Sequence, residues 1–354
     1  GLQSSRKRSE GRTRSTIKGI RVISSDPILR VEGLRTFFYT YAGVVKAVDG
    51  IGLQVNKGET VGLVGESGSG KTVTAQSILR VVPSPGKTID GKIEFEGRDL
   101  LMLTESEMQH IRGKEIAYIP QDPTTTLDPV YSVGDQLTEV IMRHQPVSKK
   151  YALSKATELL RSVGISDPEI RTTQYPHELS GGTKQRIAIA RALSCEPSLI
   201  LADEPTTALD VTIQAQILEL LLTLKQKFNL AVVLITHDMG IVADTCDRVT
   251  VLYAGQVCET GTTEQVFENP KHPYTEALLS SVPSLALRKG KLAVIPGNVP
   301  NLIQPPSGCR FHPRCSYARR ICSDKDPELE SIVDGRFVHC HRWRELDLKS
   351  AVAS

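Results

Sequence analysis

The chain has 354 residues, of which 40% are hydrophobic and 23% charged, and its formal net charge is +3. This length fits one large α/β domain with an appendage, and the composition is typical of a globular protein. The near balance of 43 basic and 40 acidic residues gives no indication of a nucleic-acid partner. The most apolar stretch, residues 217–235, is interrupted by polar residues, so no membrane-spanning helix is expected.

Residues 1–26 form a polar, basic arm without the apolar run of a signal peptide. Beyond it, apolar runs alternate with helical patterns, which favours an α/β fold with a largely parallel sheet covered on both faces. The predicted strands are 28–31, 44–55, 60–64, 199–202 and 231–235. The predicted helices are 73–82, 105–111, 133–144, 150–163, 182–194 and 213–227. The polar helices within residues 100–180 indicate a helical insertion.

A glycine-rich loop follows the predicted strand 60–64 and precedes a predicted helix. It fits the phosphate-loop pattern G-x-x-x-x-G-K-[ST] and reads Gly65-Glu66-Ser67-Gly68-Ser69-Gly70-Lys71-Thr72. Its glycines let backbone N–H groups point at phosphate oxygens, and the helix N-terminus adds a positive dipole end. We expect Lys71 to reach the β- and γ-phosphates and the Thr72 hydroxyl to bind Mg²⁺.

Two carboxylates end the apolar run Leu199–Ala202. A buried strand delivers them to the sheet edge beside the phosphate loop. We expect Asp203 to hold Mg²⁺ and Glu204 to polarise the attacking water. A purely structural role as helix caps is the alternative, and the neighbouring phosphate loop disfavours it.

A second anion-binding pattern lies just after the helical insertion, where Ser180, Gly181 and Gly182 open a predicted helix. The segment Leu179-Ser180-Gly181-Gly182-Thr183 resembles the signature of the ABC ATPase family, which usually reads LSGGQ. Thr183 departs from the usual glutamine, which leaves the hydrogen bonds of that side chain unassigned. In this family the signature binds the γ-phosphate of a nucleotide held by a partner ATPase.

The resemblance extends over residues 28–265 and implies an ABC-type nucleotide-binding domain with a phosphate-loop core, an antiparallel β subdomain and a helical subdomain. It implies that Gln121 senses Mg²⁺ and water, that Asp210 couples two active sites across a dimer, and that His237 contacts the γ-phosphate. An aromatic platform for adenine is expected upstream of the phosphate loop, with Tyr41 as first choice and Tyr39 as second.

The final segment resembles the C-terminal extension of oligopeptide and dipeptide importers. The resembling stretches are residues 269–279, 295–297 and 305–315. We therefore divide the chain into an arm (1–26), an ATPase domain (27–265, helical part about 100–180) and an extension (266–354). The resemblance implies an ATPase that powers peptide import at the cytoplasmic face of a prokaryotic membrane.

The implied partners are a second ATPase subunit (a sister chain or a second copy), two membrane permease subunits and an extracytoplasmic substrate-binding protein. Nickel, glutathione or oligosaccharide remain alternative cargoes. A soluble ABC ATPase in DNA repair or translation is disfavoured, since such proteins usually carry long coiled coils or two cassettes. An ATP-binding regulator without hydrolysis is disfavoured by Glu204 and His237.

Four of the seven cysteines crowd into the extension: Cys309, Cys315, Cys322 and Cys340. Four thiolates can bind Zn²⁺ or an iron–sulfur cluster, and their spacing alone does not decide between the two. The resemblance to peptide-importer ATPases favours a [4Fe–4S] cluster, with zinc or no metal as alternatives and His312, His339 or His341 as substitute ligands. We expect this site to order the extension and to brace the ATPase or its contact with a partner subunit, with redox sensing as the alternative. Because it lies far in sequence from every nucleotide motif, we do not expect it to take part in phosphoryl transfer.

Overall fold

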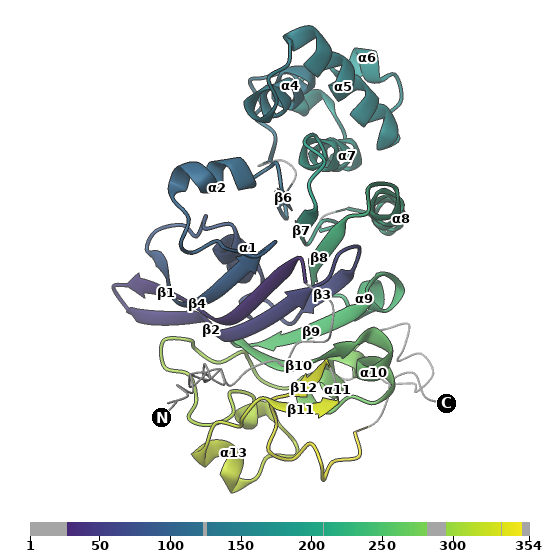
Figure 1. The fold of residues 1–354 in the computed structure, drawn as a ribbon. Coiled ribbons are helices and arrows are strands. Elements are labelled where there is room, and N and C mark those ends of the chain that lie inside the picture. The colour runs from purple at the N-terminus through teal and green to yellow at the C-terminus, as the bar shows by residue number, and fades with distance from the viewer. Residues whose placement is uncertain (1–26, 123–125, 208, 282–294, 334, 349–354) are drawn as a thin grey trace, which may run out of the picture.

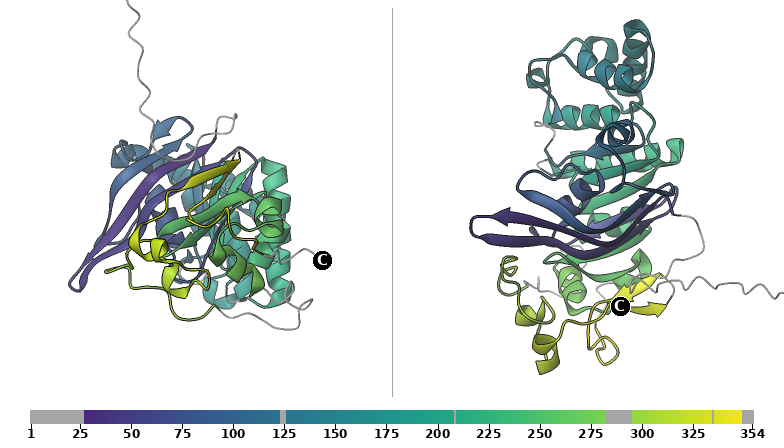
Figure 2. Two further views of the ribbon diagram at one scale, coloured as in Figure 1. Left: turned by 90° about the horizontal axis from the view of Figure 1, so that it is seen from below. Right: turned by 60° about the vertical axis from the view of Figure 1, so that its left-hand side comes forward.

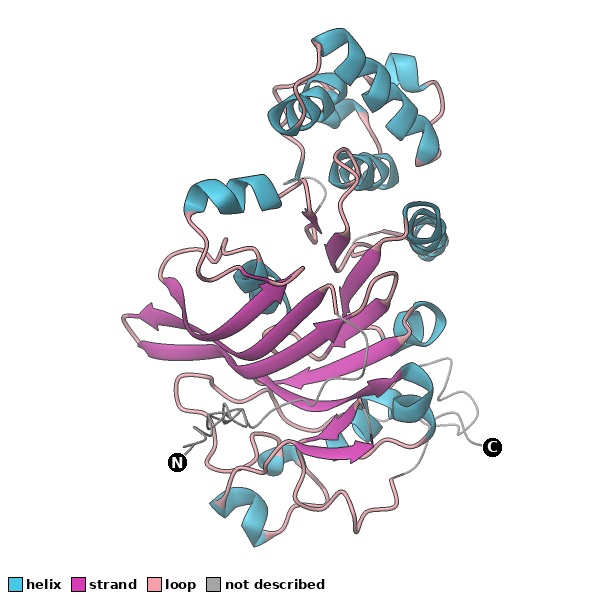
Figure 3. Cartoon of the chain, in the orientation of Figure 1, coloured by secondary structure: helices cyan, strands magenta, loops and turns pink. Residues whose placement is uncertain are grey.

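The computed structural model describes residues 27–122, 126–207, 209–281, 295–333 and 335–348, so the expected arm at 1–26 lies outside the described residues. Helices gather at one end of the molecule, two sheets form its middle, and the C-terminal extension lies at the other end (Figures 1 and 2). Loops form much of that extension (Figure 3). This arrangement confirms the predicted α/β fold with antiparallel and helical parts.

The smaller sheet is antiparallel and has the strand order β2-β1-β4-β5. Its strands are β1 (Leu29–Thr40), β2 (Gly43–Val55), β4 (Gly86–Phe95) and β5 (Arg98–Asp99). β1 and β2 form a long hairpin, paired from Leu29 with Val55 to Thr40 with Gly43. Buried residues of this sheet share one apolar core with β3 and α1. β2 approaches the phosphate loop closely, since a Cβ on Gly70 would lie 2.4 Å from the carbonyl oxygen of Ala47.

The larger sheet has the order β11-β12-β10-β9-β3-β8-β7-β6, and β9, β3, β8, β7 and β6 are parallel to one another. Its strands are β3 (Thr60–Val64), β6 (Ile116–Ile119), β7 (Leu199–Asp203), β8 (Ala231–Thr236), β9 (Arg248–Tyr253), β10 (Gln256–Thr262), β11 (Glu330–Val333) and β12 (Arg336–Val338). The extension thus adds β12 and β11 to the edge of the ATPase sheet, through the pairing of Glu259 with Val338.

The longer helices are α4 (Val133–His144), α5 (Lys149–Ser162), α7 (Gly181–Ala192) and α8 (Val211–Phe228). The shorter ones are α1 (Lys71–Ile78), α2 (Glu105–Ile111), α6 (Pro168–Arg171), α9 (Met239–Thr245), α10 (Thr263–Glu268), α11 (Pro273–Ser280) and α13 (Arg320–Asp324). None of the described helices is long and apolar enough to cross a membrane.

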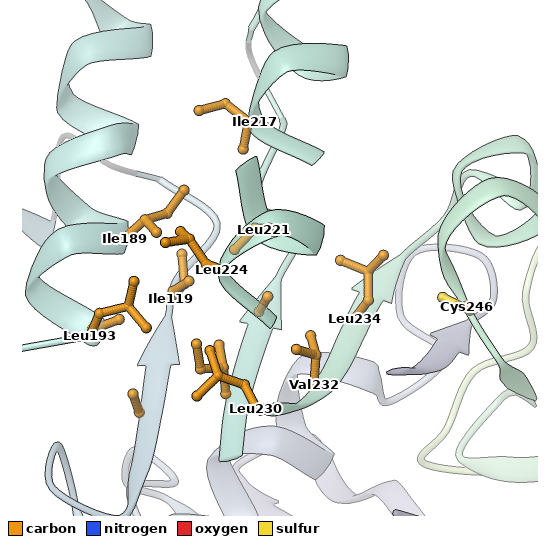
Figure 4. Packing of buried hydrophobic residues seen from close by; sticks show 14 of the residues in the cluster. Ile119, Ile189, Leu193, Ile217, Leu221, Leu224, Leu230, Val232, Leu234 and Cys246 are labelled. Atoms are coloured by element: carbon orange, nitrogen blue, oxygen red, sulfur yellow. The ribbon is translucent and has the colours of Figure 1, made fainter. Parts of the chain in front are cut away.

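One apolar core joins α7 and α8 to the parallel strands beneath them (Figure 4). α8 contributes its buried face through Ile217, Leu221 and Leu224. Burial of each such side chain stabilises the fold by about 1.5–3 kcal/mol. This packing fixes the position of the C-terminal ends of the parallel strands, where the polar residues of the site begin.

Predicted and observed elements agree best where the apolar pattern is strong. α4 and β3 have the predicted limits of 133–144 and 60–64. The helix predicted at 73–82 instead spans Lys71–Ile78, and the strand predicted at 28–31 belongs to the much longer β1. β4 escaped prediction because most of its side chains are exposed or only partly buried and lack a strong apolar pattern.

Candidate functional site

The loop between β3 and α1 is held tightly against its neighbours. Gly65 has φ +152°, and a Cβ there would lie 2.1 Å from the carbonyl oxygen of Leu252 in β9. Only glycine therefore fits at this position. The loop leads directly into α1, which begins at Lys71 and has no acidic residue in its first turn. A helix start of this kind is suited to an anion.

Lys71 folds back over the loop that precedes it. Its Nζ donates to the carbonyl oxygens of Gly65, at 2.7 Å, and Glu66, at 3.0 Å. Burial lowers the pKa of Lys71, although Glu204, Asp203 and Glu66 act in the opposite direction. The ammonium group is thus placed inside the loop, among carboxylates.

Asp203 ends β7 and faces the first turn of α1. Thr72 Oγ1 donates to Asp203 Oδ1 at 3.2 Å, and the Tyr118 hydroxyl donates to Oδ2 at 2.9 Å. Burial raises the pKa of Asp203, and these two hydrogen bonds offset only part of that rise. Thr72 and Asp203 therefore lie in contact, and their joint binding of Mg²⁺ stays a prediction. Tyr118 is an additional partner of Asp203 that sequence reasoning missed.

Glu204 lies one residue beyond β7 in a left-handed conformation, with φ +44°. Its Oε2 accepts from Thr207 at 2.8 Å and from Gln121 Nε2 at 3.0 Å, while Oε1 lies 3.1 Å from His237 Nδ1. Burial opposes ionisation of Glu204, but the bonds from Thr207 and His237 outweigh it and lower its pKa. A carboxylate in this state can orient water.

Several of these groups face one open cleft. Its lining includes Gly65, Ser67, Gln121, Glu204 and His237. Lys71 and Asp203 are buried and do not belong to this lining, but they contact the phosphate loop and Thr72. Such a set of groups is suited to phosphoryl transfer to water. Thr207 also lines the cleft and was missed, although its position three residues after Glu204 could have suggested a contact.

The signature segment does not line this cleft in the part of the chain that the structure describes. Ser180 caps α7, and its Oγ accepts from the Thr183 N–H at 3.3 Å and lies 2.9 Å from the Thr183 hydroxyl. Asp210 caps α8 by accepting from the Ile213 N–H at 3.0 Å. A Cβ on Gly182 would lie 3.0 Å from the Ile213 side chain, so the starts of α7 and α8 pack together.

The predicted adenine platform lies on the β1–β2 hairpin. Tyr41 sits at its turn and is fully exposed, while Tyr39 is partly exposed at the end of β1. Among the residues that the structure describes, neither tyrosine belongs to the lining of the cleft. Stacking on Tyr41 stays a prediction.

The four late cysteines converge although they are spread over 32 residues of sequence. Cys309, Cys315, Cys322 and Cys340 line one small cavity together with His272 and Phe311, and all four thiols are free. Gly308, with φ +66°, makes the approach possible, since a Cβ there would lie 2.4 Å from the Cys322 carbonyl oxygen. Among the described residues, however, no three His, Cys, Asp or Glu side chains lie close enough to hold a metal ion.

Burial favours the neutral form of several side chains that line this cavity. Burial raises the pKa of Cys309 to about 12 and that of Cys340 to about 11. Burial also lowers the pKa of His272 to about 3. Of the proposed substitute ligands, His312 and His341 line the cavity, whereas His339 does not belong to its lining. The scattered Cys195, Cys246 and Cys258 are buried, as expected of core thiols.

This combination of an α/β core, phosphate loop, strand-end carboxylates and a separate signature helix defines an ABC ATPase. Residues 48–207 match the family described as ABC transporter, and residues 258–322 match the C-terminal region of oligopeptide/dipeptide transporters. The chain therefore belongs to the oligopeptide/dipeptide branch of ABC transporter ATP-binding proteins.

Individual relatives support this assignment. The chain is 50% identical to the oligopeptide transport ATP-binding protein OppD of Bacillus subtilis, over 88% of this chain and 87% of the relative. It is 48% identical to the dipeptide transport ATP-binding protein DppD of Escherichia coli, over 89% of this chain and 96% of the relative.

Two solved structures share its core. One is a dimeric ATP-binding cassette with ADP and phosphate in a post-hydrolysis state (TM-score 0.60, 26% identity, 66% of this chain and 98% of that one). The other is CbiO1 from the ABC transporter complex of Clostridium perfringens (TM-score 0.59, 28% identity, 69% of this chain and 91% of that one).

Proposed function

We propose that this chain hydrolyses ATP to power the import of dipeptides or oligopeptides across the cytoplasmic membrane, bound at its cytoplasmic face. The carrying observation is the cleft lined by the phosphate loop, Glu204 and His237, beside which Lys71 contacts the loop and Asp203 contacts Thr72. The cargo follows from relatives that are named peptide transport ATP-binding proteins and match nearly the whole chain.

In the proposed reaction, the loop from Gly65 to Thr72 binds the phosphates, and Lys71 turns from its backbone partners to the β- and γ-phosphates. Thr72, Asp203 and Gln121 would hold Mg²⁺, which would neutralise charge on the phosphates. Glu204 orients the attacking water. The 3.1 Å contact between His237 and Glu204 supports a role for the imidazole beside the γ-phosphate.

We further propose that each active site is completed by a partner ATPase. Ser180, Gly181, Gly182 and Asp210 serve the partner's nucleotide, because they stand at exposed helix starts outside the cleft of their own chain. The dimeric cassette among the similar structures supports this arrangement. Two permease subunits and an extracytoplasmic binding protein would complete the transporter.

Purification of the full chain from native membranes tests the assembly. We expect two integral membrane subunits and a second ATPase to accompany it, and peptide transport in reconstituted vesicles to stop when Glu204 is replaced with Gln. Recovery with DNA-repair or translation factors instead would contradict the proposal. Transport of nickel, glutathione or oligosaccharide but not peptide would correct the cargo alone.

We propose that Cys309, Cys315, Cys322 and Cys340 hold a [4Fe–4S] cluster, with Zn²⁺ as the alternative. Their convergence on one cavity supports this, as does the Arg342 N–H that points at Cys340 Sγ at 3.4 Å. Since the thiols lie too far apart for metal binding in the described structure, cluster formation requires them to close in and lose their protons.

Metal analysis of anaerobically purified protein tests the cluster. We expect a brown protein with about four irons per chain. Stoichiometric zinc without iron would favour the alternative, and absence of both metals would leave four ordinary thiols.

A further inference from the structure

A residue of the extension contacts the phosphate loop directly. Arg314 makes a bidentate pair with the Glu66 carboxylate, with Nη1 2.7 Å from Oε2 and Nη2 3.1 Å from Oε1. The two residues are 248 positions apart in sequence. The sequence did not reveal this contact, since Arg314 lies far in sequence from every nucleotide motif.

Glu66 is held at three points. Besides the Arg314 pair, its backbone N–H donates to the Tyr274 hydroxyl at 2.9 Å, and its carbonyl oxygen accepts from Lys71 Nζ at 3.0 Å. Tyr274 belongs to α11 and packs its ring against Phe311, with centroids 5.2 Å apart. Two of the three anchors on this residue of the phosphate loop therefore come from beyond residue 265.

The pair is substantially shielded from solvent. The Arg314 side chain is only 5% exposed and that of Glu66 29%, so solvent screens their attraction little. Burial alone would lower the pKa of Arg314, but its bonds to Glu66 and Tyr253 raise it above the ordinary value. Glu66 lines the nucleotide cleft, and without Arg314 its carboxylate would face incoming phosphates as an uncompensated negative charge.

A second arginine on the same short loop reinforces this link. Arg310 pairs with Asp49 of β2 and donates to the carbonyl oxygen of Ala254. The next residue, Gly255, donates its N–H to the carbonyl oxygen of Ser69 at 3.0 Å. The loop from Cys309 to Cys315 therefore supports both ends of the phosphate loop.

We propose that Arg314 is a positioning residue for ATP binding: through Glu66 it fixes the phosphate loop and neutralises a carboxylate in the cleft, so that the C-terminal extension sets nucleotide affinity. This rests on the proposed assignment of residues 65–72 as the phosphate loop. Any group that orders Cys309 and Cys315 would act on ATP binding by the same route, since these cysteines bracket both arginines.

Binding of a fluorescent ATP analogue with Mg²⁺ to the full chain tests this proposal. We expect Arg314→Ala to weaken affinity about fivefold or more, by loss of a charge-assisted pair, while kcat at saturating ATP changes less than about twofold. Adding Glu66→Gln to Arg314→Ala should restore most of the affinity, because the unpaired carboxylate is then gone. Arg320→Ala, at a side chain 94% exposed in the same extension, serves as the matched control.

The double variant separates positioning from misfolding, since a merely unfolded extension would not be rescued by a change in the phosphate loop. Arg314→Lys should give an intermediate affinity, because it keeps the charge but loses the fork geometry. Affinity within twofold of the parent in folded Arg314→Ala, or no rescue by Glu66→Gln, would overturn the inference. Normal affinity in Lys71→Ala would instead overturn the phosphate-loop assignment itself.

Discussion

In the nucleotide cleft each functional side chain is placed by the strand just before it, whereas in the C-terminal extension side chains are placed by contacts with distant parts of the chain. Asp203 ends β7, Glu204 comes directly after it, and His237 follows β8. Arg314 and Arg336, by contrast, are held by Glu66 and Glu259. A functional motif can thus lie in one short stretch of sequence, while the residues that hold it in place lie far away in the chain. Changes at the nucleotide site should therefore alter chemistry or direct phosphate binding, and changes in the extension should alter stability and, more weakly, affinity.

The largest effect is expected where the extension joins the sheet. Arg336 Nη2 donates to Glu259 Oε1 at 2.9 Å, and the Glu259 side chain is fully buried. Arg336→Ala would leave that carboxylate without its ion-pair partner and should lower the free energy of unfolding by about 3–5 kcal/mol. Thermal or denaturant unfolding measures the loss. Unchanged stability would mean that the extension is not integrated with the ATPase core.

The next effect concerns chemistry in the cleft. Glu204→Gln should lower kcat about 100-fold or more, because the amide cannot polarise water, while ATP binding is kept. Steady-state hydrolysis and nucleotide binding together check this. Glu169→Gln, at an exposed side chain paired with Arg161, is the control. Near-normal turnover in Glu204→Gln would show that another residue acts as the base.

Lys71→Ala should act on binding. Loss of a charged donor to the phosphates is expected to weaken ATP affinity about 10- to 100-fold. Equilibrium binding of labelled ATP is the measurement, with Lys149→Ala as an exposed control on α5. The same assay also measures the smaller loss of ATP affinity expected for variants in the extension, so the two regions can be compared directly.

The smallest effect is expected at Tyr274. Tyr274→Phe removes the hydroxyl that accepts the Glu66 N–H but keeps the ring against Tyr253 and Phe311. Loss of one neutral hydrogen bond should weaken ATP affinity about threefold. Titration beside the parent protein resolves this change. An effect as large as that of Lys71→Ala would show that the ring itself has moved.

The sequence alone determined the ATPase core. Strong apolar runs predicted β3, β7 and β8, and polar residues directly after them predicted the phosphate loop, Asp203, Glu204 and His237. Such positions can be predicted because a strand fixes the position of the residue that follows it, and both are read from one short stretch. The roles of these residues stay predictions. The same locality explains why Ser180 was found at the start of α7.

Only the tertiary structure decided how the extension meets this core. Nothing within a short window around Arg314, Tyr274 or Tyr118 distinguishes these residues from other arginines and tyrosines. Their partners lie 248, 208 and 85 positions away in sequence, and chain folding alone brings them together. The pairing of β12 with β10 and the convergence of four cysteines have the same origin. Long-range contacts depend on how whole elements pack, which no local pattern records.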